Sequence, residues 1–144
     1  MNSVTAERVK WINALRENVA ELTGLTYNWS ASGTWDETSG EPGQDKERQK
    51  ARDETVLKLD RLQMLIKLQL NPIEDQAIIS KLDELRGHTH KFRIDQLKAD
   101  LSALISMVQA LLKDEWEKVK DEARSSLIPR WLRCKPVCSR RHSR

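Results

Sequence analysis

The chain has 144 residues, of which 33% are charged and 5% are aromatic, with five glycines and four prolines. This length suits one domain that can close a hydrophobic core without disulfides or metals. The charged, leucine-rich composition favours helices over sheet, because the valine, threonine and tyrosine runs typical of strands are scarce. No apolar run approaches the roughly 20 residues of a membrane span, and the N-terminus shows no signal peptide, so we expect a cytoplasmic protein.

The first predicted helix begins near Ser3 or Thr5, because either side chain can cap the free amides of a first turn. The same apolar spacing continues to Trp29, so we predict that this helix passes through Gly24 and ends near Ser30. Its apolar residues recur every three or four positions and share one face: Val9, Ile12, Leu15, Val19 and Leu22.

Residues 32–44 follow with three glycines and a proline around Trp35. This segment has no apolar period, so we predict a mobile loop. Three interpretations of Trp35 are open: it folds back onto the helices, it contacts a partner, or it is simply exposed.

A second helix is predicted from Asp45, a capping residue, to about Leu70. Leu65 and Leu68 are expected to widen its inner face. The apolar row that defines this inner face consists of Val56, Leu59, Leu62, Ile66 and Leu70.

A short third helix is predicted to begin at Asn71-Pro72. Asn71 can supply a capping oxygen, proline tolerates the first helical position, and Glu74 stands where a capping box places its carboxylate. Gly87 is expected to end this helix. Its inward-facing residues are predicted to be Ile78, Leu82 and Leu85.

The fourth predicted helix runs from about Thr89 to Ala123 and has two adjacent apolar rows. Two such rows imply two neighbouring helices, as in a bundle. The sequence therefore predicts an all-α protein, an elongated antiparallel helical bundle or coiled coil of three long helices plus one short helix, with residues 1–123 as its domain. The two rows are Ile94, Leu97, Leu101, Leu104, Val108 and Leu111, and Ile105, Leu112 and Val119.

The C-terminal residues 124–144 contain seven Lys or Arg and no acid, which leaves 18 basic and 22 acidic residues in 1–123. Pro129 and Pro136 break any helix there. We therefore predict a flexible tail of charge +7 on a body of charge −4. Such tails contact phosphate, anionic lipid or acidic proteins, or only stay solvated. The candidate partner contacts are Arg130, Trp131, Arg133, Lys135, Arg140, Arg141 and Arg144, together with Trp35.

Motifs for catalysis are not found: the sequence has no glycine-rich phosphate loop, no zinc-protease motif and no nucleophile elbow. His88 and His90 lie beside acidic residues in a predicted turn, where solvated histidines are common. Cys134, Cys138 and His142 stand four residues apart, but a structural zinc site normally has a fourth ligand. We therefore expect no catalytic, cofactor or metal site, and two ordinary thiols.

Three motifs carry a resemblance to known sequences. They are Lys-Trp-Ile-x-x-Leu-Arg at 10–16, Leu-Asn-Pro at 70–72, and Lys-Asp-Glu-Trp-Glu-Lys-Val-Lys at 113–120. With them, residues 11–122 resemble a type of uncharacterised bacterial helical protein, often membrane-anchored, that has a Leu-Asn-Pro helix junction. The resemblance implies a helical fold in the cytosol and no assigned activity.

These observations favour a non-enzymatic protein-interaction module that acts through a helical face, the basic tail or both. One alternative is a small phage or mobile-element protein that inhibits a host enzyme by binding. Another is contact of the tail with nucleic acid or an anionic membrane, which would place the protein at the membrane periphery. Another protein is the expected partner, and self-association is a further option.

Overall fold

The computed structural model describes residues 3–32, 44–90 and 94–127. Four helices occupy these ranges: α1 (Ser3–Ser32), α2 (Gln44–Gln69), α3 (Gln76–His90) and α4 (Ile94–Leu127). Every described residue outside Leu70–Asp75 is helical, so this part of the chain contains no strand. The predicted all-α fold of three long helices and one short helix is confirmed.

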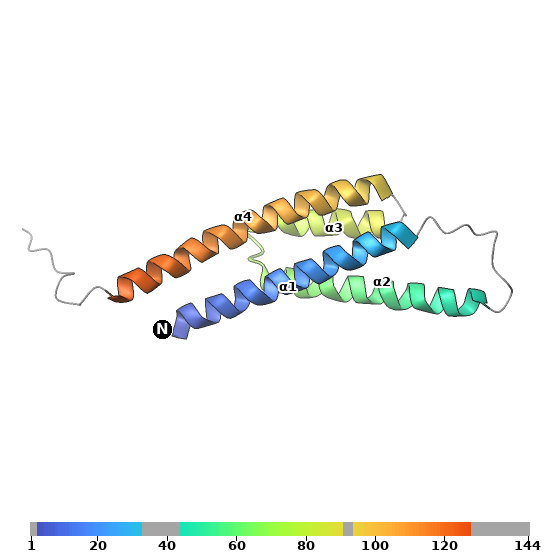
Figure 1. Ribbon diagram of the computed structural model, residues 1–144. Helices are drawn as coiled ribbons and strands as arrows, with labels where there is room; N and C mark the ends of the chain where they lie inside the picture. The colour runs from blue at the N-terminus through green and yellow to red at the C-terminus, as the bar shows by residue number, and fades with distance from the viewer. Residues whose placement is uncertain (1–2, 33–43, 91–93, 128–144) are drawn as a thin grey trace, which may run out of the picture.

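The four helices are antiparallel and form an elongated bundle (Figure 1). α1 packs against both α2 and α4, and α3 packs against α4, whereas α2 and α3 make few contacts with each other. The N-terminal end of α1 and the C-terminal end of α4 extend together past the α2–α3 turn (Figure 1). α1 and α4 are therefore the central pair, and α2 is held mainly from one side.

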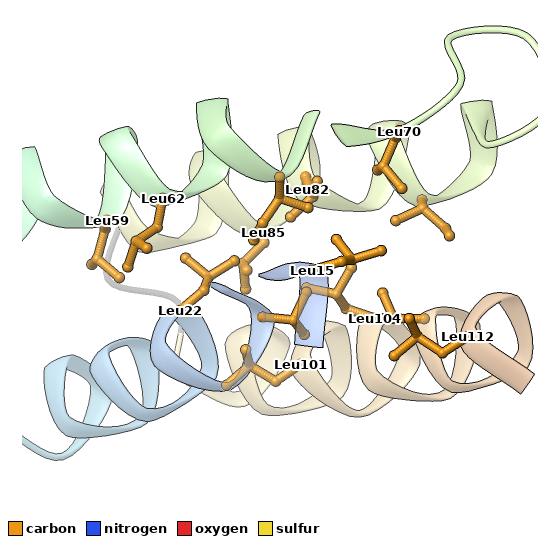
Figure 2. Close-up of a cluster of buried hydrophobic side chains, with 14 of the residues drawn as sticks. Leu15, Leu22, Leu59, Leu62, Leu70, Leu82, Leu85, Leu101, Leu104 and Leu112 are labelled. Atoms are coloured by element: carbon orange, nitrogen blue, oxygen red, sulfur yellow. The ribbon is translucent and has the colours of Figure 1, made fainter. Parts of the chain in front are cut away.

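The core is a row of aliphatic side chains contributed by all four helices, which point toward one another in Figure 2. Burial of one leucine contributes about 1.5–3 kcal/mol, so this row is the main source of stability. The spacing of three and four residues predicted most of it correctly. The buried leucines are Leu15, Leu22, Leu59, Leu62, Leu70, Leu82, Leu85, Leu97, Leu101, Leu104 and Leu112.

The α2–α3 turn uses the predicted cap, but with a different carboxylate. The side-chain oxygen of Asn71 accepts hydrogen bonds from the backbone amides of Ile73 (3.0 Å) and Glu74 (3.4 Å). The amide of Asn71 donates to Oδ2 of Asp75 (2.8 Å), so Asp75 takes the role predicted for Glu74. Residues 72–75 form a tight turn, and α3 begins at Gln76 rather than at the proline.

The predicted boundary at Gly87 is wrong, because α3 continues through this glycine to His90. The hydroxyl of Thr89 donates to the Leu85 carbonyl (2.8 Å), and Nε1 of Trp29 donates to the carbonyl of Thr89 (3.4 Å). Glycine inside a helix costs about 1 kcal/mol relative to alanine, and the burial of Thr89 against α1 offsets that cost. α4 accordingly begins at Ile94 instead of near Thr89, and it runs past the predicted end at Ala123 to Leu127.

No helix in the described ranges is long and apolar enough to cross a membrane.

Candidate protein-interaction surfaces

The tail contacts predicted from the sequence, Arg130 to Arg144, and Trp35 lie outside the described residues. The same is true of Cys134, Cys138 and His142, and of the predicted mobile loop apart from its two ends. The candidate surfaces are therefore formed by the four helices alone.

The outer face of α2, opposite the core, exposes large apolar side chains. Leu57 is 68% exposed, Met64 53% and Leu68 84%. The prediction that Leu65 and Leu68 widen the inner face of α2 is wrong, because both point away from the core and are exposed. Isolated exposed leucines are common, but a row of apolar side chains along one helix makes that face a candidate contact surface.

These residues follow one line along the helix. Leu57, Arg61, Met64 and Leu68 are separated by four, three and four residues, which places them on one stripe. We call these four residues the outer stripe of α2. α2 is thus apolar on two opposite sides, and only the inner side is covered by α1.

Ion pairs hold α2 to its neighbours on both flanks of the outer stripe. On one flank, Lys58 binds Glu21 of α1 (Nζ to Oε1, 2.7 Å). On the other flank, Asp60 accepts a hydrogen bond from Nη2 of Arg86 of α3 (3.1 Å), whose Nε lies 3.0 Å from the other carboxylate oxygen. These pairs leave the outer stripe between them uncovered.

On the same flank, the ammonium of Lys67 binds Asp83 of α3. α3 therefore borders the outer stripe through the two pairs Asp60–Arg86 and Lys67–Asp83, and does not cover it. Charges that flank an apolar stripe are the arrangement by which paired helices select a partner and a register.

A groove of about 570 Å³ lies where the α2–α3 turn meets α1 and α4. Val4, Trp11 and Leu111 give it an apolar lining, and Nε1 of Trp11 donates to the carbonyl of Gln69 (2.8 Å). Arg8 and Lys118 are its basic residues. Its acidic residues outnumber them, so the groove disfavours anionic ligands. The acidic lining residues are Glu7, Glu74, Asp75, Asp114 and Glu115.

Near this groove, the projecting ends of α1 and α4 are joined by polar contacts. Arg8 binds Glu115 (3.5 Å) and Glu122 (2.7 Å), and the hydroxyl of Thr5 donates to Glu122 (3.0 Å). Arg8, the basic residue that α1 contributes to the groove, is therefore paired with carboxylates of α4. The remaining acidic residues keep the groove negatively charged.

A buried carboxylate joins α3 to α4. Asp100 is almost fully buried, and its oxygens lie 2.5 Å from Nδ1 of His88 and 3.4 Å from Nζ of Lys81. The pKa of Lys81 is raised above 10.5, mainly by its hydrogen bond to Glu84 and further by Asp100. This cluster satisfies a buried charge and ties two helices together.

The described side chains contain no group of three or more His, Cys, Asp or Glu residues placed to hold a metal ion. His88, one of the two histidines considered for metal binding, faces Asp100 in an interhelical contact. Its side chain does not lie in a solvated turn as predicted, because α3 extends beyond Gly87.

Comparison of the chain with protein-family models, with curated proteins and with solved structures gives no match.

Sequence reasoning missed the outer stripe of α2, although a signal for it was present. The steps of four, three and four from Leu57 to Leu68 define a second apolar line, opposite to the row through Leu59 and Ile66. Assigning Leu68 to the inner face, and leaving Leu57 and Met64 without a face, concealed that line.

Proposed function

We propose that this chain is a non-enzymatic protein-interaction module that binds an amphipathic helix of a partner protein on the outer stripe of α2. The observation that supports the proposal is the exposure of Leu57, Met64 and Leu68 on a helix whose opposite side is already packed. Helix binding in this mode uses aliphatic anchors at three- and four-residue spacing.

The exposed apolar surface of α2 favours a partner with an apolar seam. Covering exposed aliphatic surface gains about 25 cal/mol per Å², and the three exposed apolar side chains lie on one stripe that Arg61 alone interrupts. Ordinary surface helices keep charged residues on the side away from the core. A nucleic acid would gain little from this apolar stripe, because its affinity comes from phosphate contacts with basic residues.

The experiment compares affinity capture by the full-length protein with capture by two variants in the cells that produce it. L57K/L68K places two charges in the outer stripe, and Y27K places one at an exposed aromatic residue of α1. Circular dichroism and the urea midpoint should be unchanged in both variants, because all three positions are exposed.

The proposal expects a bound protein that the wild type and Y27K retain and that L57K/L68K loses. Equal retention by all three proteins would overturn it. A third variant without residues 128–144 separates contact through the tail from contact through the helix, because only a tail-dependent partner is lost with that deletion.

A further inference from the structure

The outer stripe of α2 has the spacing of a coiled-coil seam. Steps of four, three and four residues are those at which one helix meets another along its length. A coiled-coil seam alternates between two kinds of position. Leu57 and Met64, seven residues apart, would occupy one kind, and Arg61 and Leu68, also seven apart, would occupy the other. Four consecutive seam positions are thus available on a side of α2 that no described helix covers.

A parallel pair of α2 helices is disfavoured by Arg61. Parallel pairing sets each seam residue against the same residue of the other helix, so two guanidinium groups would meet at the centre. Antiparallel pairing instead sets alternating seam positions against each other. Leu57 then faces Leu68 of the second copy, and Arg61 faces Met64, where its aliphatic stem can pack while the guanidinium stays in solvent.

The flanking charges distinguish this antiparallel register from its neighbours. With Leu57 opposite Leu68, the flanking Asp60 of one helix lies closest to Lys67 of the other, twice by symmetry. Sliding one helix by seven residues in one direction brings Asp60 against Asp60. Sliding it by seven in the other direction brings Lys67 against Lys67. Only the register that covers all the apolar seam residues also places opposite charges together.

From this complementarity we propose that two copies of the chain associate back to back through the outer stripes of their α2 helices, antiparallel, with Leu57 against Leu68. This inference rests on the proposed function and specifies the partner helix as α2 of a second copy. The interface is self-complementary, as a twofold symmetric dimer requires. Asp60 and Lys67 keep their bonds to Arg86 and Asp83, so the flank that carries them gains two networks of four alternating charges, related by the twofold axis.

The charge pairs and the apolar contacts contribute differently to the affinity of the dimer. Exposed charge pairs contribute little to affinity, so Asp60 and Lys67 select the register. Association itself derives from the leucine and methionine side chains. Changes in the apolar seam should therefore weaken the dimer far more than added salt does.

Cysteine cross-linking tests the register directly in the full chain. In a C134S/C138S background, we prepare L57C and L68C separately and oxidise each alone and both mixed. A disulfide needs Cα atoms within about 7 Å. In the antiparallel dimer, Leu57 faces Leu68 of the other copy, whereas the two Leu57 residues are displaced by eleven positions, or about 16 Å along the axis.

The proposal predicts that the mixture yields a cross-linked heterodimer at least about tenfold more abundant than the homodimer from either variant alone. A parallel pair would instead cross-link L57C with itself, and that result would overturn the proposal. Equal, slow cross-linking in all three samples would also contradict it.

Sedimentation equilibrium of the unmodified protein gives an independent test. We expect a dimer whose dissociation constant rises at least about tenfold in L57K/L68K and stays the same in Y27K. A wild-type protein that remains monomeric at millimolar concentration would overturn self-association. If L57K/L68K nevertheless lost another bound protein, the proposed function would stand and only this inference would fail.

Discussion

The indole Nε1 of Trp11 donates a hydrogen bond to the backbone carbonyl of Gln69, 2.8 Å away. Gln69 is the last residue of α2, where a helix leaves carbonyl groups without intrahelical partners. Trp29, further along α1, does the same for the carbonyl of Thr89 in the last turn of α3. Two tryptophans of one helix therefore each satisfy a carbonyl group at the C-terminal end of another helix.

Replacing Trp11 by phenylalanine should destabilise the fold by about 1 kcal/mol or somewhat more. A smaller aromatic ring remains, but the Gln69 carbonyl loses its donor, and a typical hydrogen bond contributes roughly that amount. The urea midpoint should fall while the slope stays the same. W116F, at a half-exposed tryptophan of α4, is the control, and its midpoint should stay within about 0.5 kcal/mol of wild type.

An aspartate at Leu101 should prevent folding, whereas the same change at Leu68 should not. Leu101 is 5% exposed in the core, and an unpaired buried carboxylate costs several kcal/mol against a total of about 5–15. Leu68 stands on the outer stripe in solvent. Far-ultraviolet circular dichroism should show lost helicity for L101D only. Native-like melting of L101D would mean that this part of α4 is not core.

Removing the carboxylate of Asp100 should cost about 1–3 kcal/mol, because His88 loses its partner at the α3–α4 contact and Lys81 keeps only Glu84 of its own helix. D114A is the matched control, since Asp114 lies on the exposed side of the same helix. Chemical denaturation of D100A, D114A and wild type measures the difference. Equal stability of D100A and D114A would show that the cluster contributes nothing.

The stabilisation from Lys81 should depend on pH in a defined direction. Its pKa is raised above 10.5 by Glu84 on its own helix and by Asp100 of α4, which also faces His88. A raised pKa means that the stabilisation is fully present below pH 10.5 and is lost as pH rises through the folded-state pKa. The difference in melting temperature between wild type and K81M should therefore be constant below pH 10.5 and shrink as the pH rises above it. A difference that stays constant above pH 10.5 would contradict this account.

The inner faces of the helices could be predicted from the sequence because burial against one neighbour leaves a repeat of three and four residues. Leu15, Leu82 and Leu104 follow this rule and are fully buried. The boundaries at Gly87 and Thr89 could not be predicted, because they depend on Trp29, which is distant in sequence and close in space. Local helix signals do not include such contacts.

Periodicity places Leu68 opposite the row through Leu59 and Ile66, but it does not tell whether that side of α2 is covered. A repeat gives the angle of a side chain around its helix, but not which side of the helix a neighbour covers. α3 packs on α4 and touches α2 only lightly, so the side of α2 that carries Leu68 stays open. Leu68, which was predicted to belong to the core, is therefore part of the candidate interaction surface.

Hydroxyl-radical footprinting of the full-length protein tests most directly whether the outer stripe is a binding surface. Met64 is 53% exposed on the stripe and Tyr27 is 59% exposed on α1, so the two should oxidise readily in a dilute purified sample. In concentrated protein or in the producing cells, the account predicts protection of Met64, Leu57 and Leu68 with no change at Tyr27. If the extent of Met64 oxidation under both conditions equalled that in the dilute sample, the outer stripe would not be a binding surface.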